Sequence, residues 1–180
     1  MTRKPRRQSP AQGRRESTSS HKGEPHLELE VNRLLDAFAT DLRRLCGERH
    51  AVDLKFASRD LDVSLNPVVF KQVMVALVRN AIEAMPSGGM VSIETAVRPT
   101  SGPSGNDCAA ISVIDTGIGM AGSIVARAHF AHFTTKTDHP GLGLSTAAAF
   151  AKELGGTIII KSEVHVGTAV SLILPMRTVH

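Results

Sequence analysis

The order in which helix-like and strand-like segments follow one another is the feature that most constrains the fold of this chain. Hydrophobic periodicity predicts three helices, at residues 27–45, 67–85 and 141–154. It predicts six extended segments, at residues 52–57, 61–65, 90–98, 108–114, 156–164 and 167–175. The strands come in pairs between helices, which is typical of an α+β fold. We expect a two-layer sandwich with helices on one face of a mixed, mostly antiparallel sheet.

A glycine spacing in the stretch VIDTGIGMAG offers a different interpretation. Gly117, Gly119 and Gly122 match the G-x-G-x-x-G pattern of dinucleotide-binding loops, and a strand-like run precedes them. That fold requires each helix to return the chain to a parallel strand. The following segment, AHFTTKTDHPG, contains no such strand, and its Asp138 lies in a polar stretch. We therefore predict that the spacing does not mark a dinucleotide site.

The N-terminal residues 1–25 differ in composition from the rest. They contain seven Lys or Arg, two Glu and no Val, Ile, Leu or Phe, so they cannot bury enough apolar surface to fold. We predict a disordered basic tail at 1–25 and one folded domain at 26–180. The tail carries a charge of +5, which leaves about −1 of the chain total of +4 for the domain. The chain lacks Trp and Tyr, so no specific nucleic-acid binding is expected.

Cysteine usage and hydropathy bear on the compartment. Cys46 and Cys108 are far apart and belong to no C-x-x-C motif, which favours reduced thiols. No apolar run approaches the ~18 residues that cross a bilayer. We expect a cytoplasmic protein without a membrane span.

One amide marks the helix predicted from Pro67 to Met85. Val73, Leu77, Asn80 and Ala84 fall on one helical face, so Asn80 lies on or beside the buried stripe. A buried amide without partners costs about 1–3 kcal/mol. Two interpretations remain open: Asn80 bonds the backbone, or its amide oxygen faces a cation.

Two further segments carry polar chemistry next to glycines. Asp115 ends an apolar strand, where it can accept a hydrogen bond from an exocyclic amine, while Gly117 and Gly119 let the backbone approach a flat ring. Gly141 and Gly143 precede a helix, whose free N–H groups can bind phosphate. Each of these patterns is weak when it stands alone.

Taken together and in order, these segments resemble the ATP-binding domain of sensor histidine kinases, in the superfamily shared with DNA gyrase, mismatch-repair and heat-shock chaperone ATPases. The matching motifs are QVMVALVRNAIEAMPSGG, VIDTGIGM, FAHFTTK and GLGLSTAAAFAKELGGTIIIKSEVHVGTAVSLILP. The resemblance covers about residues 27–176 and implies a Bergerat-type ATP-binding fold.

The resemblance implies a role for each matching residue at the adenine end of ATP. Asp115 would bind the adenine amino group, and Gly117 and Gly119 would shape the adenine pocket. Thr168 would support that pocket through hydrogen bonding.

At the phosphate end, the resemblance implies that Asn80 coordinates the Mg²⁺ that bridges the ATP phosphates, with Glu83 as a nearby polar candidate. Lys136 is a catalytic candidate that would contact the terminal phosphates, the alternative being a solvated lysine. The residues implied to line the phosphate side of a mobile lid are Gly141, Gly143 and Leu144.

The chain departs from the family pattern at two places. Ala76 stands one turn before Asn80, where hydrolysing relatives carry a Glu that activates water. His139 and Pro140 replace the glycines that usually lead into GLGL. We therefore expect slow ATP hydrolysis and altered closure of the lid.

The resemblance implies transfer of the γ-phosphoryl group to a histidine, but no acceptor box of the H-E-x-x-x-P type precedes the domain. His26, at the start of the first predicted helix, lacks that context. The expected function is the catalytic domain of a histidine kinase that phosphorylates a histidine on a partner chain in two-component signalling. The alternatives are a nucleotide-responsive binding module and a serine kinase like the anti-sigma factors. A metal cluster formed by His129, His132, Asp138 and His139 is not expected, because such spacing is usually incidental.

Overall fold

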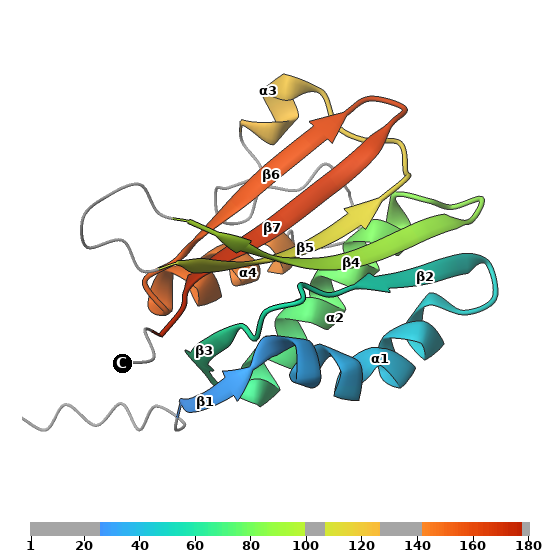
Figure 1. The fold of residues 1–180 in the computed structure, drawn as a ribbon. Coiled ribbons are helices and arrows are strands. Elements are labelled where there is room, and N and C mark those ends of the chain that lie inside the picture. Colours follow the sequence, from blue (N-terminus) through green and yellow to red (C-terminus); the bar gives the residue numbers. More distant parts are fainter. Residues whose placement is uncertain (1–25, 100–106, 127–141, 178–180) are drawn as a thin grey trace, which may run out of the picture.

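One sheet forms a layer of the fold, and helices form the other (Figure 1). The computed structural model describes residues 26–99, 107–126 and 142–177. The strands of the sheet, in spatial order, are β2 (His50–Lys55), β4 (Gly89–Arg98), β5 (Cys108–Asp115), β7 (Gly167–Pro175) and β6 (Thr157–Glu163). β2 runs parallel to β4, and the other neighbours are antiparallel. The α+β prediction is thereby confirmed.

The main helices lie on one side of the sheet (Figure 1). They are α1 (Val31–Cys46), α2 (Pro67–Glu83) and α4 (Leu142–Glu153). The core lies between the two layers, where Phe70 of α2 packs against Phe150 of α4 with ring centroids 6.1 Å apart. This packing sets α2 and α4 side by side.

The glycine spacing in VIDTGIGMAG does not belong to a dinucleotide fold, as predicted. The preceding strand, β5, is antiparallel to both of its neighbours. Gly122 begins α3 (Gly122–Val125), a helix of only four residues. The crossover to a parallel strand that the dinucleotide fold requires is therefore missing here.

The expectation of one helix over residues 27–45 is wrong at its start. Residues Leu27–Glu30 form β1, which pairs antiparallel with β3 (Asp62–Leu65) in a small second sheet. The helix begins after Glu30, whose carboxylate accepts hydrogen bonds from the backbone N of Asn32 and Arg33 at 2.9 and 2.7 Å. The four-residue LELE alternation was too short to be separated from helical spacing without knowledge of its partner strand.

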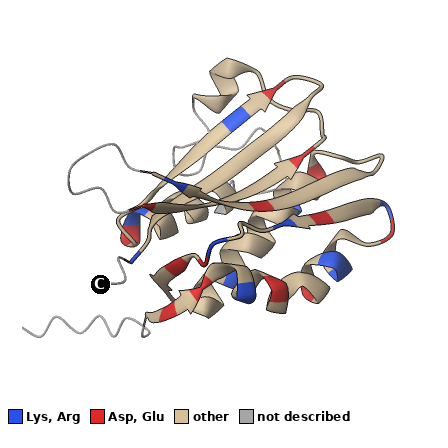
Figure 2. Cartoon of the chain, in the orientation of Figure 1, with Lys and Arg blue, Asp and Glu red and all other residues tan. Residues whose placement is uncertain are grey.

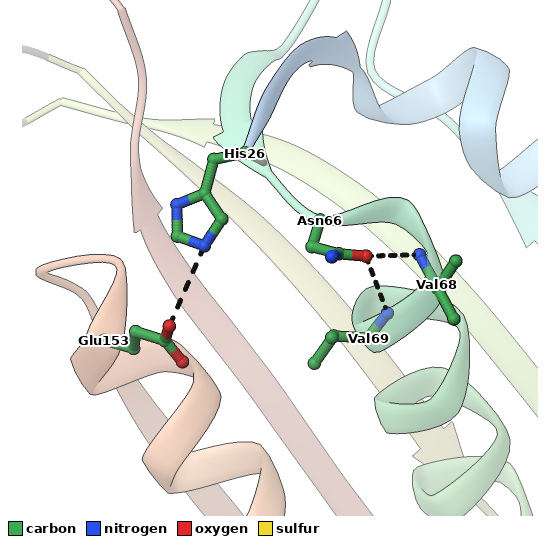
Figure 3. Close-up of polar contacts among 5 residues, drawn as sticks. All are labelled: His26, Asn66, Val68, Val69 and Glu153. Carbon is green, nitrogen blue, oxygen red and sulfur yellow. Dashed lines mark hydrogen bonds and ion pairs between the residues drawn. The ribbon is translucent and has the colours of Figure 1, made fainter. Parts of the chain in front are cut away.

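The helix that carries Asn80 has clear signals at its start. Asn66 is buried, and its side-chain oxygen accepts hydrogen bonds from the N–H groups of Val68 and Val69 at 2.9 and 3.2 Å (Figure 3). Pro67 takes the first helical position, where no N–H is needed. The prediction of a helix from Pro67 to Met85 is thus confirmed to within two residues of its end.

The two predicted strand pairs are also confirmed. β4 and β5 pair from Val91↔Asp115 to Arg98↔Cys108. β6 and β7 meet in a tight turn in which His165 adopts a positive φ of 63°. Both pairs bring strand ends to the same end of the sheet as the DTGIG loop.

The remaining features of the fold concern thiols, charge and hydropathy. Cys46 and Cys108 are free, and burial raises the pKa of the Cys46 thiol. Figure 2 shows acidic and basic residues interspersed along α1 rather than separated by sign. Among the described residues, no helix is both long and apolar enough to span a bilayer. The predicted tail at 1–25 lies outside the described residues.

Candidate functional site

Asp115 is a buried carboxylate at the end of a core strand. Its Oδ1 accepts hydrogen bonds from the backbone N–H of Gly117 at 2.8 Å and of Thr168 at 3.2 Å. Thr168 is its register partner on β7 and is also buried. Two donors from different segments therefore fix the carboxylate at the end of the central strand β5.

The DTGIG loop that follows Asp115 packs tightly against the end of α2. The backbone N–H of Ile118 donates to the carbonyl of Ala84 at 3.0 Å. A Cβ atom at Gly117 would lie 2.5 Å from that carbonyl oxygen and 2.8 Å from the Ala84 Cβ. Only glycine fits at position 117 without moving the loop away from α2.

The same loop is held on its other side by the β6–β7 turn. His165 N–H donates to the Ile118 carbonyl at 2.8 Å. Gly119 has a positive φ of 63°, and a Cβ there would collide with the Glu163 carbonyl. The loop backbone thus lies between α2 and the turn, and two of its residues must be glycine for that reason.

Asn80 lies on α2 one helical turn before Ala84, which is about 6 Å along the axis. Its side chain faces the first turn of α4. A Cβ at Gly143 would lie 2.5 Å from Asn80 Nδ2 and 3.0 Å from Asn80 Oδ1. The α4 backbone can approach the Asn80 amide this closely only because residue 143 is glycine.

The C-terminal half of α2 and its cap residue therefore contact two glycine-containing segments. Ala84, the C-cap, contacts the DTGIG loop, and Asn80 contacts the start of α4. Asp115 at the start of this loop accepts a hydrogen bond from the Thr168 N–H of the neighbouring strand β7. The structure thus gathers, around the C-terminal half of α2, residues that the sequence places 88 positions apart.

The other predicted site residues are distributed as follows. Leu144 packs against the core from α4, and Glu83 is exposed on α2. Ala76 is half-buried one turn before Asn80. Several predicted residues lie outside the described part of the chain: Lys136, Gly141, His129, His132, Asp138, His139 and Pro140. Within the described ranges, no group of three or more His, Cys, Asp or Glu side chains could hold a metal ion.

His26 lies far from these residues. It precedes β1 instead of beginning a helix, and its Nε2 is 3.8 Å from Glu153 Oε1 at the C-terminal end of α4 (Figure 3). Gly143 is near the opposite end of that helix, ten residues before Glu153 and therefore about 15 Å away along the axis. The His26 side chain therefore does not belong to the site around Asn80.

Two side chains near the site were not identified from the sequence. The Ser162 hydroxyl lies 2.8 Å from Thr168 Oγ1 and accepts a hydrogen bond from the Met120 N–H at 2.8 Å. The Thr116 hydroxyl accepts a hydrogen bond from the Met90 N–H at 3.2 Å. Both contacts depend on which strands are neighbours, and no local sequence pattern carries that information.

Comparison with known proteins identifies similar sequences and folds. The family model described as "Histidine kinase-, DNA gyrase B-, and HSP90-like ATPase" matches residues 66–178. The chain is 35% identical over 108 residues to sporulation kinase C of Bacillus subtilis, and this match covers 60% of this chain and 24% of that kinase. It is 34% identical over 163 residues to sensor kinase CckA of Brucella abortus, and this match covers 83% of this chain and 17% of that kinase. The chain thus spans less than a quarter of the length of each of these relatives.

Solved structures share the fold. The nucleotide-free catalytic domain of the histidine kinase ThkA matches with a TM-score of 0.66 and 25% identity, covering 84% of this chain and 95% of that one. The mycobacterial sensor histidine kinase MprB matches with a TM-score of 0.69 and 18% identity, covering 86% and 99% of the two chains.

Proposed function

Because this chain belongs to the family of histidine kinase-, DNA gyrase B- and HSP90-like ATPases, as an ATP-binding catalytic domain of the histidine-kinase type, we propose that it uses Mg·ATP to phosphorylate a histidine on a partner protein. The family membership that the four motifs indicated is confirmed. The observation that carries the proposal is the double contact of α2, which meets the DTGIG loop at Ala84 and the start of α4 at Asn80.

At the adenine end, the residues present fit a purine with an exocyclic amine. The Asp115 carboxylate is fixed by two backbone donors, so it can accept a hydrogen bond from the amine with little reorganisation. Gly117 and Gly119 let the loop backbone pack tightly against Ala84 and the Glu163 carbonyl, which fixes the backbone that would border the ring. The Thr168 hydroxyl stands next to Asp115 in register and supports the ring.

At the phosphate end, Asn80 supplies an amide oxygen, which is one of the ligand types that Mg²⁺ accepts together with phosphate oxygens. Gly143 keeps the space beside that amide free of a side chain. The N–H groups of the first turn of α4, at Gly143 and Leu144, are suited to bind phosphate. Glu83, Gly141 and Lys136 complete the proposed phosphate side.

Positioning and charge neutralisation are the means of phosphoryl transfer in this proposal. Mg²⁺, when bound, neutralises charge on the phosphates and thereby favours attack on the γ-phosphorus. Asn80 holds the metal, Asp115 and the glycine loop fix the purine, and the start of α4 orients the phosphates. Ala76 offers no carboxylate to activate water, so hydrolysis of ATP is expected to be slow.

The acceptor belongs to a partner domain in a two-component pathway. His26 lies at the far end of α4 from Gly143, so it does not reach phosphates that are bound beside Asn80. A helical-hairpin domain with a phosphoacceptor histidine is the expected partner. Since such pathways draw on intracellular ATP, we assign the domain to the cytoplasm.

Calorimetric titration with ATP, with and without Mg²⁺, tests the site. We expect Asp115→Asn to abolish adenine recognition, because one carboxylate oxygen is replaced by an amide NH2 group, which can only donate hydrogen bonds. We expect Asn80→Ala to remove mainly the Mg²⁺ dependence of binding. Asp36→Asn and Thr40→Ala, exposed on α1, are the matched controls. Unchanged binding in both site variants would overturn the assignment.

Transfer is tested with labelled ATP and a purified helical-hairpin domain of a histidine kinase. Acid-labile label on the hairpin supports the proposal, and its loss in a hairpin whose acceptor histidine is replaced identifies the residue. Intact ATP binding without label on any hairpin contradicts transfer and favours the nucleotide-responsive binding module.

A further inference from the structure

A row of polar side chains closes one end of the sheet. On the face toward the helices, the inner positions of β6 and β7 are apolar, as Ile158, Ile160, Val170 and Leu172 are buried there. The next position on this face is polar in both strands: it is Ser162 near the end of β6 and Thr168 near the start of β7. Asp115, Thr168 and Ser162 are register neighbours across β5, β7 and β6. Side chains at alternate positions share one face, so these three polar groups lie side by side at the end of the sheet where β5 and β6 stop (Figure 1).

The glycine loop spans this row and is attached at both of its ends. At its start, Asp115 Oδ1 accepts the Gly117 N–H at 2.8 Å. At its end, Ser162 Oγ accepts the Met120 N–H at 2.8 Å. The first attachment belongs to the adenine-binding carboxylate of the proposed function. The second has the same length, and it comes from a strand 42 residues later in the chain.

The Ser162 hydroxyl also links the loop to Thr168. Its oxygen accepts from Met120, and its one proton can go to Thr168 Oγ1 at 2.8 Å or to the Gly167 carbonyl at 3.0 Å. A hydroxyl has one donor and two acceptor positions, so when Ser162 donates to Gly167 it accepts from both Met120 and Thr168, and its capacity is fully used. The direction of the Thr168 O–H bond is therefore coupled to that of Ser162.

We propose that Ser162 is a positioning residue for purine recognition, which holds the far end of the glycine loop through Met120 and orients the Thr168 hydroxyl beside Asp115. This inference rests on the proposed function. Asp115 alone attracts an exocyclic amine, but it discriminates only if the ring cannot shift away from it. Ser162 supplies that restraint, because it fixes both the loop on which the ring lies and the hydroxyl next to it.

The restraint governs discrimination between ATP and inosine triphosphate. Inosine carries a carbonyl in place of the amine, and this oxygen faces the Asp115 carboxylate unfavourably. In a fixed site, the mismatch cannot be relieved and inosine triphosphate binds weakly. When the loop is released, the ring shifts and water separates the two oxygens. Loss of the Ser162 hydroxyl therefore lowers ATP affinity more than it lowers affinity for inosine triphosphate.

Ser162→Thr and Ser162→Val give an isosteric pair that differs only in the hydroxyl, and both residues suit a strand. We expect the valine variant to bind Mg·ATP about tenfold more weakly than the wild type and to lose at least threefold in its preference for ATP over inosine triphosphate. The threonine variant retains both. Amide exchange at Met120 accelerates in the valine variant only.

Ser171→Ala is the matched control. Ser171 is a half-buried serine of the same sheet, and its hydroxyl is 2.7 Å from that of Ser112 on the neighbouring strand, away from the row. We expect Ser171→Ala to leave the preference for ATP over inosine triphosphate unchanged. If Ser162 had a purely structural role, Ser162→Val would weaken the binding of ATP and of inosine triphosphate equally and would also leave this preference unchanged. That result overturns the inference. A wild-type protein that binds neither nucleotide instead overturns the proposed function.

Discussion

Replacing Gly143 with alanine tests the close approach of α4 to Asn80. The new Cβ would lie 2.5 Å from Asn80 Nδ2 and 3.1 Å from Asn80 Cγ, whereas non-bonded heavy atoms prefer about 3.5–4.0 Å. An overlap of this size must be relieved by rotation of the amide or by displacement of α4. Overpacking of this kind costs about 1–3 kcal/mol, which corresponds to a factor of roughly 5 to 150 in an equilibrium constant.

This cost is expected in binding rather than in folding. Without ligand, the half-buried Asn80 side chain can rotate away from the new methyl group. Alanine also favours the helix over glycine by about 1 kcal/mol. With Mg·ATP bound, the amide must return to its place, and the strain then opposes binding. We therefore expect Gly143→Ala to leave the melting temperature nearly unchanged and to weaken Mg·ATP binding about ten- to hundredfold.

This prediction is tested by measuring Mg·ATP affinity by calorimetry and the melting temperature by thermal unfolding. The four proteins to compare are the wild type, Gly143→Ala, Asn80→Ala and the double variant. If the methyl group acts through the Asn80 amide, it has little effect once that amide is gone, so the two changes are strongly non-additive. Gly122→Ala is the control, because a Cβ at the first residue of α3 meets nothing within 4 Å. Equal losses in both backgrounds, or no loss at all, would refute the reasoning.

Three further changes probe the DTGIG loop and contacts of α1 and α2 elsewhere in the fold. Gly119→Ala forces a side chain into a positive φ and against the Glu163 carbonyl, so urea unfolding is expected to show a loss of about 1–3 kcal/mol. His50→Ala removes ring contacts of 3.0 and 2.9 Å to carbonyls at the ends of α1 and α2, with a similar expected loss. The hydrogen bond and charge of Lys71 lower the pKa of Asp41. This interaction contributes to the free energy of unfolding at neutral pH, and the contribution is lost as the pH falls through the lowered pKa of Asp41. In Lys71→Met, the free energy of unfolding should therefore fall less between pH 5 and pH 2 than it does in the wild type.

Local signals in the sequence were sufficient for the elements that build the site. α2 is delimited by Pro67 at its start and by a Pro-Ser-Gly-Gly stop after Met85, and its apolar stripe is long enough to distinguish a helix from a strand. The β4–β5 and β6–β7 pairs could be predicted because each has two apolar runs close together in sequence. The placement of Asp115 at a strand end follows from the same pattern.

Other features required knowledge of distant partners. β1 is a strand only because β3 lies beside it, and its four residues were mistaken for the start of a helix. Asn66 acts as an N-cap through hydrogen bonds to Val68 and Val69 that its sequence position permits but does not require. The importance of Ser162 depends on the register between β6 and β7.

Sequence pattern was enough to locate the helices and strands other than β1 and the polar groups that interrupt apolar runs, because both depend on periodicity and on neighbours a few residues away. The tertiary structure alone decided that Asn80 meets Gly143 and that Ala84 meets Gly117. These contacts arise when α2 packs against α4 and the sheet to bury the core. Their geometry is a consequence of how side chains of distant segments fill a shared volume, which a one-dimensional pattern does not specify.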